Sequence, residues 1–190
     1  MWQVEEFGTS HEGRPGVLLA DGSEPKPVIF DTGSGPTVHE SSDWWIYNGT
    51  LRAPRATDLR GSCSCGWRGG ERYPVDWESV DSRRPYLFDT QGPESDWQRH
   101  MEEVGARSTP LPAGLVALLD QVGEQLDALV TDAPLAALKA VAALERITRD
   151  AGEMAAHYVE ADAVSDETLA AALGLTEKDA RSRLFHYAHR

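Results

Sequence analysis

The chain has 190 residues, 31 of them acidic and 18 basic, which gives a formal net charge of −13. Apolar residues make up 41% and charged residues 26%, values typical of a soluble globular protein. No apolar run is long enough to cross a bilayer, the first residues lack the apolar segment of a secretory signal, and two cysteines cannot form a disulfide framework. We therefore expect a cytoplasmic protein with reduced thiols and no membrane contact.

Residues 1–108 are predicted to form a small β-rich unit with many turns, because glycine, proline and acidic residues interrupt its apolar runs. Three of these runs predict short strands: 17–20, 27–30 and 44–47. The last run is followed by Asn48-Gly49, a pair that suits the positive φ angles of a two-residue hairpin turn. A short helix is predicted over 92–105, starting near Pro93.

Both cysteines of the chain lie in the segment CSCGW, where Cys63 and Cys65 are separated by one residue and followed by Gly66. In an extended strand the two side chains point to the same face but lie too far apart for an unstrained disulfide. Two thiolates on one face, with a glycine that lets backbone N–H groups turn toward the sulfurs, form half of a metal site. The segment resembles the Cys-x-Cys-Gly knuckle variants of small zinc-binding units, and this resemblance implies a structural Zn²⁺.

A structural zinc needs four ligands, so two more side chains are required. His100 is expected to be the third ligand, because it lies on the helix that follows the β segment. For the fourth, His39 ranks above Asp96, since imidazole suits zinc beside thiolates, and His11 ranks after both. Two alternatives stay open: a pair of partly buried thiols without metal, and a redox pair, although Cys-x-Cys lacks the helix context that activates Cys-x-x-Cys thiols.

The middle segment, residues 109–162, is predicted to form two long amphipathic helices separated at Pro134, with Gly152 as a candidate break in the second. Apolar residues recur at helical spacing in both. They are Leu115, Leu118, Leu119, Val122, Leu126, Leu129 and Val130, then Leu135, Leu138, Val141, Leu144, Ile147, Met154 and Tyr158. The first interpretation is an ordinary core, and the second is a face through which the chain forms a homodimer.

Residues 163–190 are predicted to form a helix-turn-helix. Ser165 and Thr176 are placed to cap the beginnings of two helices, and Gly174 is placed to end the first. Small residues stand where the two helices would cross: Ala170 and Ala180. The last fifteen residues hold four basic and two acidic side chains, the local basic excess of an acidic chain.

The stretch AALGLTEKDARSRLFHYA is similar to the C-terminal helix-turn-helix of extracytoplasmic-function sigma factors and related bacterial regulators. Its RSRL segment is in register with the second helix of that family, whereas Ala180 replaces the usual Val or Ile. The resemblance implies that residues 177–189 form a recognition helix in the major groove of double-stranded DNA. The side chains that would face DNA are Lys178, Arg181, Ser182, Arg183 and His186. The rest of the chain does not resemble a sigma factor, so a sigma factor proper is not expected.

Enzyme motifs give little support to a catalytic function. Asp31-Thr32-Gly33 matches the aspartic-protease triplet, but such an enzyme needs a second carboxylate and the motif does not recur. No phosphate-binding loop, dinucleotide fingerprint or nucleophile elbow is present. We treat the triplet as a chance match and expect a protein that is not an enzyme.

Together these features predict an α+β protein in three parts: a turn-rich β unit with a zinc site, a helical connector or dimer segment, and a helix-turn-helix. The predicted function is a bacterial DNA-binding transcriptional regulator with a structural zinc. The alternative is a non-enzymatic adaptor that binds a protein through its acidic surface and uses the helix-turn-helix as a scaffold. In that case Arg181 and Arg183 are solvated charges. The acidic chain predicts weak non-specific DNA binding under either interpretation, because phosphate contacts drive that affinity.

Overall fold

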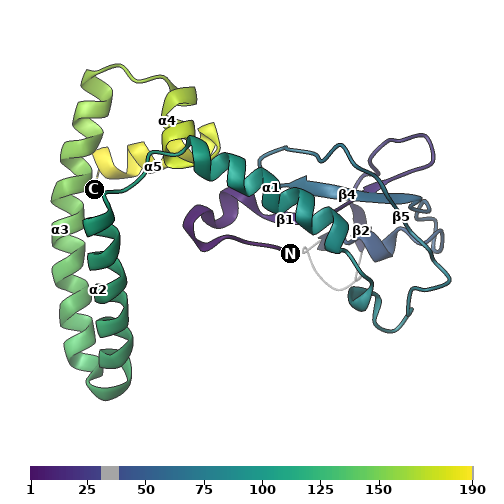
Figure 1. Cartoon of the computed structure of the whole chain (residues 1–190), viewed down its shortest axis with the longest axis horizontal. Coiled ribbons are helices and arrows are strands. Elements are labelled where there is room, and N and C mark those ends of the chain that lie inside the picture. Colours follow the sequence, from purple (N-terminus) through teal and green to yellow (C-terminus); the bar gives the residue numbers. More distant parts are fainter. Residues whose placement is uncertain (31–38, 190) are drawn as a thin grey trace. The chain divides into compact units, whose positions relative to one another are not determined.

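The computed structural model describes residues 1–30 and 39–189, and the protein is α+β as predicted (Figure 1). The chain divides into two compact units, Met1–Ala106 and Arg107–Arg190. The predicted connector and the predicted helix-turn-helix therefore belong to one unit, where the sequence suggested two. The aspartic-protease-like triplet at 31–33 lies outside the described residues.

The first unit is built on a three-stranded antiparallel sheet in the order β1-β4-β5. A separate two-stranded antiparallel sheet is formed by β2 and β3. The strands are β1 (Gly13–Leu18), β2 (Val28–Phe30), β3 (His39–Ser41), β4 (Asp58–Cys63) and β5 (Tyr73–Pro74). The register places Gly13 opposite Cys63, so the segment before β1 reaches the end of β4, where the cysteines lie.

Three short 3-10 helices complete the irregular part of this unit: η1 (Glu5–His11), η2 (Trp44–Ile46) and η3 (Pro85–Leu87). The strand predicted over 44–47 is wrong, because these residues form η2 and the turn after it. Trp44 and Tyr47 are both buried, and a 3-10 turn places residues three apart on one side whereas a strand places them on opposite faces. Gly49 has the expected positive φ of 82°, but the chain reverses through a longer loop.

Helix α1 (Gln91–Arg107) packs against the sheet and extends past both ends of the helix predicted over 92–105. It approaches closely because glycines face it. A Cβ on Gly13 would lie 2.5 Å from the ring of Trp97, and one on Gly61 would lie 2.7 Å from the carbonyl oxygen of Pro93. Trp97 and Met101 of α1 share a buried cluster with Phe7 and Cys63, which fixes the helix over the cysteines.

The second unit is helical and consists of α2 (Ala113–Asp132), α3 (Pro134–Ala161), α4 (Asp166–Leu173) and α5 (Glu177–Ala188). Figure 1 shows α2 and α3 as a hairpin of two long helices. The predicted break at Gly152 is wrong, since α3 runs through it. A Cβ there would lie 3.1 Å from the ring of Tyr187, so this glycine lets α5 approach α3. Among the described residues, no helix has the length and apolar content needed to cross a membrane.

The local signals of the predicted helix-turn-helix are confirmed. The Ser165 side chain accepts a hydrogen bond from the Thr168 amide at 3.2 Å, and the Thr176 hydroxyl accepts one from the Asp179 amide at 3.2 Å. Gly174 ends α4 in the left-handed region at φ 60°. The two helices share a buried core: Leu169, Ala170, Leu175 and Ala180.

The interpretation of the long apolar stripes as an ordinary core is wrong for most of their residues. Among its described residues α2 has no buried side chain, and α3 buries only Ala137 and Ala156. Leu119 is 53% exposed and Ile147 is 66% exposed. The reason is geometric: α2 and α3 cover one side of each other and α5 covers part of α3, but the apolar stripes span more than these sides.

The complete burial of Ala180 leads to a stability prediction. Ala180 is 0% exposed between α4 and α5, so Ala180→Val should overpack this contact and lower the free energy of unfolding by about 1–3 kcal/mol. Ser182→Val, on the exposed side of the same helix, adds the same side chain without a clash and should change the stability by less than about 0.5 kcal/mol. Urea unfolding followed by circular dichroism measures both. Equal stabilities of the two variants would contradict the packing described here.

Candidate metal centre

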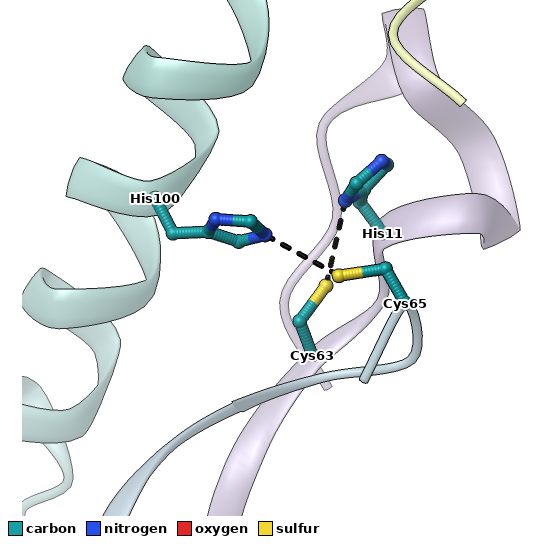
Figure 2. Close-up of side chains that lie close together, drawn as sticks. All are labelled: His11, Cys63, Cys65 and His100. Carbon is teal, nitrogen blue, oxygen red and sulfur yellow. Dashed lines mark hydrogen bonds between the residues drawn. The ribbon is translucent and has the colours of Figure 1, made fainter. Parts of the chain in front are cut away.

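Four side chains converge in the first unit and could hold a metal ion: His11, Cys63, Cys65 and His100 (Figure 2). Their ligand atoms all lie within 4.8 Å of one another. The Cys63 sulfur is 3.6 Å from Nδ1 of His11, and the Cys65 sulfur is 3.4 Å from Nε2 of His100. In a tetrahedral zinc site, with Zn–S near 2.3 Å and Zn–N near 2.0 Å, ligand atoms are about 3.5 Å apart. The two S···N distances of the cluster are therefore close to those between ligands of a tetrahedral zinc site.

The sequence correctly grouped Cys63, Cys65 and His100, and it ranked the fourth member last. His11 takes that place, brought in by the pairing of β1 with β4. His39 belongs to β3, and its side chain lies outside the described part of the chain. Asp96 is not a member of the cluster: its carboxylate accepts hydrogen bonds from the Tyr73 hydroxyl at 3.0 Å and from Arg99 at 3.2 Å.

The two thiols are brought to one side by a tight turn at the end of β4. Gly66 has φ 99°, a conformation that favours glycine, and its amide donates to the Cys63 carbonyl oxygen at 3.1 Å. The next amide, that of Trp67, points at the Cys65 sulfur at 3.5 Å. The expected role of Gly66, to turn N–H groups toward the sulfurs, is therefore confirmed at Cys65. Such a contact stabilises a thiolate.

Ser64, between the two cysteines, ties the turn to the segment that carries His11. Its hydroxyl oxygen lies 3.0 Å from the carbonyl oxygens of both Thr9 and Ser10, and it accepts a hydrogen bond from the Glu12 amide at 2.9 Å. The Ser64 amide in turn donates to the Glu12 carbonyl at 2.8 Å. Sequence reasoning missed this residue, because its partners are more than fifty positions away along the chain.

Aromatic rings fix the orientation of both imidazoles. The Trp67 indole stacks on His100, with ring centroids 4.5 Å apart and planes inclined by 4°. The ring of Phe7 meets His11 edge-on at 6.0 Å. Since His11 is itself buried, both histidines present a defined ring nitrogen to the sulfurs. The stacking of Trp67 on His100 could have been expected from the sequence, because this tryptophan directly follows the segment CSCG.

The two thiols differ strongly in acidity. The hydrogen bond from Cys65 lowers the pKa of Cys63 well below its ordinary value against the opposing effect of burial, and contacts with His100 and His11 lower it further. The same pairing with Cys63, together with burial, raises the pKa of Cys65. A metal ion held by both sulfurs would bind them as thiolates, so its binding would release protons from this pair.

The residues predicted to face DNA all lie on α5, in the second unit. Every one of them is exposed: Lys178, Arg181, Ser182, Arg183 and His186. Arg181 also forms an ion pair with Asp166 of α4, and both side chains remain accessible to solvent. These residues form part of the α5 surface and none belongs to the metal cluster.

Comparisons of the chain with protein-family models, with curated protein sequences and with solved structures give no match. The geometry of the metal cluster and the arrangement of α4 and α5 are therefore the basis for assigning a function.

The position of Ser64 leads to a prediction about metal affinity. Ser64→Ala removes the hydroxyl that holds the His11 segment, so zinc affinity should fall about 10- to 100-fold, as for other residues that orient metal ligands. Ser79→Ala is the matched control, because the Ser79 hydroxyl also donates to a backbone carbonyl, that of Asp76, in a turn away from the cluster. Competition with a chromophoric chelator measures both affinities. A Ser64 variant that binds zinc as tightly as the control would show that this hydroxyl does not orient the site.

Proposed function

We propose that the protein is a DNA-binding transcriptional regulator whose N-terminal unit is held together by a structural zinc ion. The observation that carries the metal part is the convergence of two thiols and two imidazoles within 4.8 Å. The DNA-binding part is supported by the capped helix-turn-helix of α4 and α5 and by the basic side chains on the exposed surface of α5.

The donor set favours zinc over calcium and magnesium. Thiolate and imidazole ligands suit zinc, whereas calcium and magnesium take oxygen ligands. Four protein ligands fill a tetrahedral coordination sphere, which is typical of a structural site, since a catalytic zinc keeps a position for water or substrate. The four ligands come from η1, from the end of β4 and the turn after it, and from α1, so one ion would join the three parts of the unit that pack around Cys63.

The outer face of α5 has the chemistry of a reading surface for DNA. Lys178, Arg181, Ser182 and Phe185 recur at three- and four-residue spacing, which places them on one face of the helix, opposite the buried Ala180. Lysine and arginine side chains bind phosphates and guanine edges, and an exposed phenylalanine can contact a thymine methyl group. The N-terminus of α5 is capped within the turn, so its first residues are ordered for insertion into a groove.

The zinc proposal is tested by metal content. Purified protein should hold about one zinc ion per chain, and His11→Ala should lose most of it, because three remaining ligands bind zinc more weakly. His39→Ala is the control, since it removes the histidine that the sequence ranked higher. It should keep about one zinc per chain. Elemental analysis by mass spectrometry gives the stoichiometry.

Two results would contradict the zinc proposal or its ligand set. Wild-type protein that is free of metal and takes up no added zinc would overturn the proposal, because a site of two thiolates and two imidazoles is expected to bind zinc. Loss of zinc from the His39 variant, with zinc retained in the His11 variant, would move the fourth ligand to His39.

The DNA proposal is tested by selection from a randomised duplex library followed by gel shift. Lys178→Ala combined with Arg181→Ala, both on the outer face of α5, should weaken binding to the selected sequence at least about tenfold, because each lost base contact costs about 1–3 kcal/mol. Arg146→Ala combined with Arg149→Ala removes the same charge from exposed positions of α3 and should leave affinity within about threefold. Equal losses in the two double variants would mean that net charge, and not the α5 surface, controls binding.

A protein-binding adaptor is the second candidate, and the exposed apolar side chains of α2 and α3 favour it. Under this interpretation the helix-turn-helix serves as a scaffold and the acidic surface contacts another protein. Wild-type protein that selects no duplex at low salt, where phosphate contacts are strongest, would favour the adaptor over the DNA-binding regulator.

A further inference from the structure

A small cavity in the first unit lies beside the paired strands β1 and β4, and the four residues of the metal cluster lie outside its lining. Its volume is about 170 Å³, roughly the space that five or six liquid waters occupy. Glycine, valine and proline form part of its wall. The polar side chains in the lining are Arg14, Glu24, Ser42, Tyr47, Ser62 and Arg68. The cavity is therefore large enough for a small polar ligand.

The Ser62 hydroxyl is buried at this cavity and has no hydrogen-bond partner among the described residues. The residue is only 3% exposed. Gly16, on the neighbouring strand, leaves room for the hydroxyl, because a Cβ at this position would collide with the Ser62 oxygen. Buried polar groups without a partner are unfavourable, and in folded proteins they generally contact a ligand, an ion or an ordered water. The orphaned hydroxyl therefore indicates that the cavity receives a polar group.

The charges around the cavity indicate which kind of polar group it receives. Arg60 and Arg68 both form ion pairs with Glu24, and the Nε of Arg68 lies 2.7 Å from its carboxylate. Arg14 forms no ion pair with any described residue. Three guanidinium groups against one carboxylate leave two positive charges uncompensated, in a chain whose net charge is −13. This local excess favours an anion.

Arg14 lies close to the rigid wall that Tyr47 forms. Burial raises the pKa of Tyr47, whereas a hydrogen bond with Ser42 and the charge of Arg14 lower it, so these groups are near one another. The Tyr47 hydroxyl donates to the Lys26 carbonyl oxygen at 2.9 Å, which fixes the ring in place. Asp43 also lies near Tyr47 and raises its pKa, but it does not line the cavity. The guanidinium of Arg14 is therefore available to a ligand in the cavity.

We propose that this cavity binds a small phosphate-type oxyanion through Arg14, Arg68 and the Ser62 hydroxyl. Guanidinium groups present several N–H donors in a plane that matches the oxygens of a phosphate, and a serine hydroxyl can donate to a further oxygen. Glu24 already accepts from two arginines, so it holds Arg68 in position. Free phosphate and the phosphate group of a small monoester share this chemistry. The inference does not depend on zinc or on DNA binding.

The test is isothermal titration calorimetry of the whole chain with inorganic phosphate, at an ionic strength held constant with sodium chloride. Wild-type protein should bind about one phosphate ion per chain. Arg14→Gln removes a charge without an ion-pair partner among the described residues and should weaken binding at least about tenfold. Arg83→Gln, the control, removes the same charge from an exposed position outside the lining and should leave the affinity within about twofold.

A second titration distinguishes the two sources of the phosphate group. Glycerol 3-phosphate that binds more tightly than inorganic phosphate would identify a monoester as the ligand. Equal or weaker binding of glycerol 3-phosphate would identify free phosphate. Both results require that Arg14→Gln weakens the binding of the tighter ligand.

Ser62→Ala tests the hydroxyl without removing a contact within the described part of the chain. The variant should bind phosphate at least about tenfold more weakly. In phosphate-free buffer it should be at least as stable as the wild type in urea unfolding, because an unpaired buried hydroxyl is removed, and its metal content should be unchanged. A purely structural serine would give the reverse, lower stability with unchanged affinity. That result, wild-type protein that binds neither ligand saturably, or an Arg14 variant that binds as tightly as the Arg83 variant would overturn the proposal.

Discussion

The first unit depends on holding two sulfurs and two imidazole nitrogens, from three separate segments, within 4.8 Å of one another. Bringing these groups out of water is unfavourable unless they have partners, so the surrounding structure supplies them: the Gly66 turn, the Ser64 contacts and the Trp67 ring. Glycines at 13 and 61 then let α1 come close enough to add His100. The end of β4, the turn at Gly66 and helix α1 therefore all contact this small cluster of sulfurs and imidazoles, which lies in an otherwise apolar region.

The proposed zinc ion would change the energetics of this unit more than any single contact. Structural zinc in small sites contributes about 10–16 kcal/mol, as much as the entire stability of many domains. The unit has a second cluster around Trp44, Tyr47 and Leu59, away from the cysteines, so its folding does not rest on the metal cluster alone. A metal joining η1, β4 and α1 would chiefly order the end of the sheet that this second cluster does not reach.

In the second unit, the determining factor is how completely the helices bury one another's apolar side chains. Around Ala180, which is completely buried, the α4 and α5 helices share a packed core. Along α2 and α3 large apolar side chains remain exposed, although α5 packs against part of α3. The second unit therefore combines a fully packed contact between α4 and α5 with a helical hairpin whose described apolar side chains are largely exposed.

The sequence by itself determined the features that depend on neighbouring residues. The caps at Ser165 and Thr176, the left-handed Gly174 and the turn that pairs Cys63 with Cys65 are local, because each needs only a few adjacent positions. The tertiary structure alone decided which histidine completes the cluster, since His11 reaches Cys63 across 52 residues through the register of β1 and β4. It also decided that the long stripes stay exposed, because periodicity shows which face of a helix is apolar, whereas burial depends on what packs against that face.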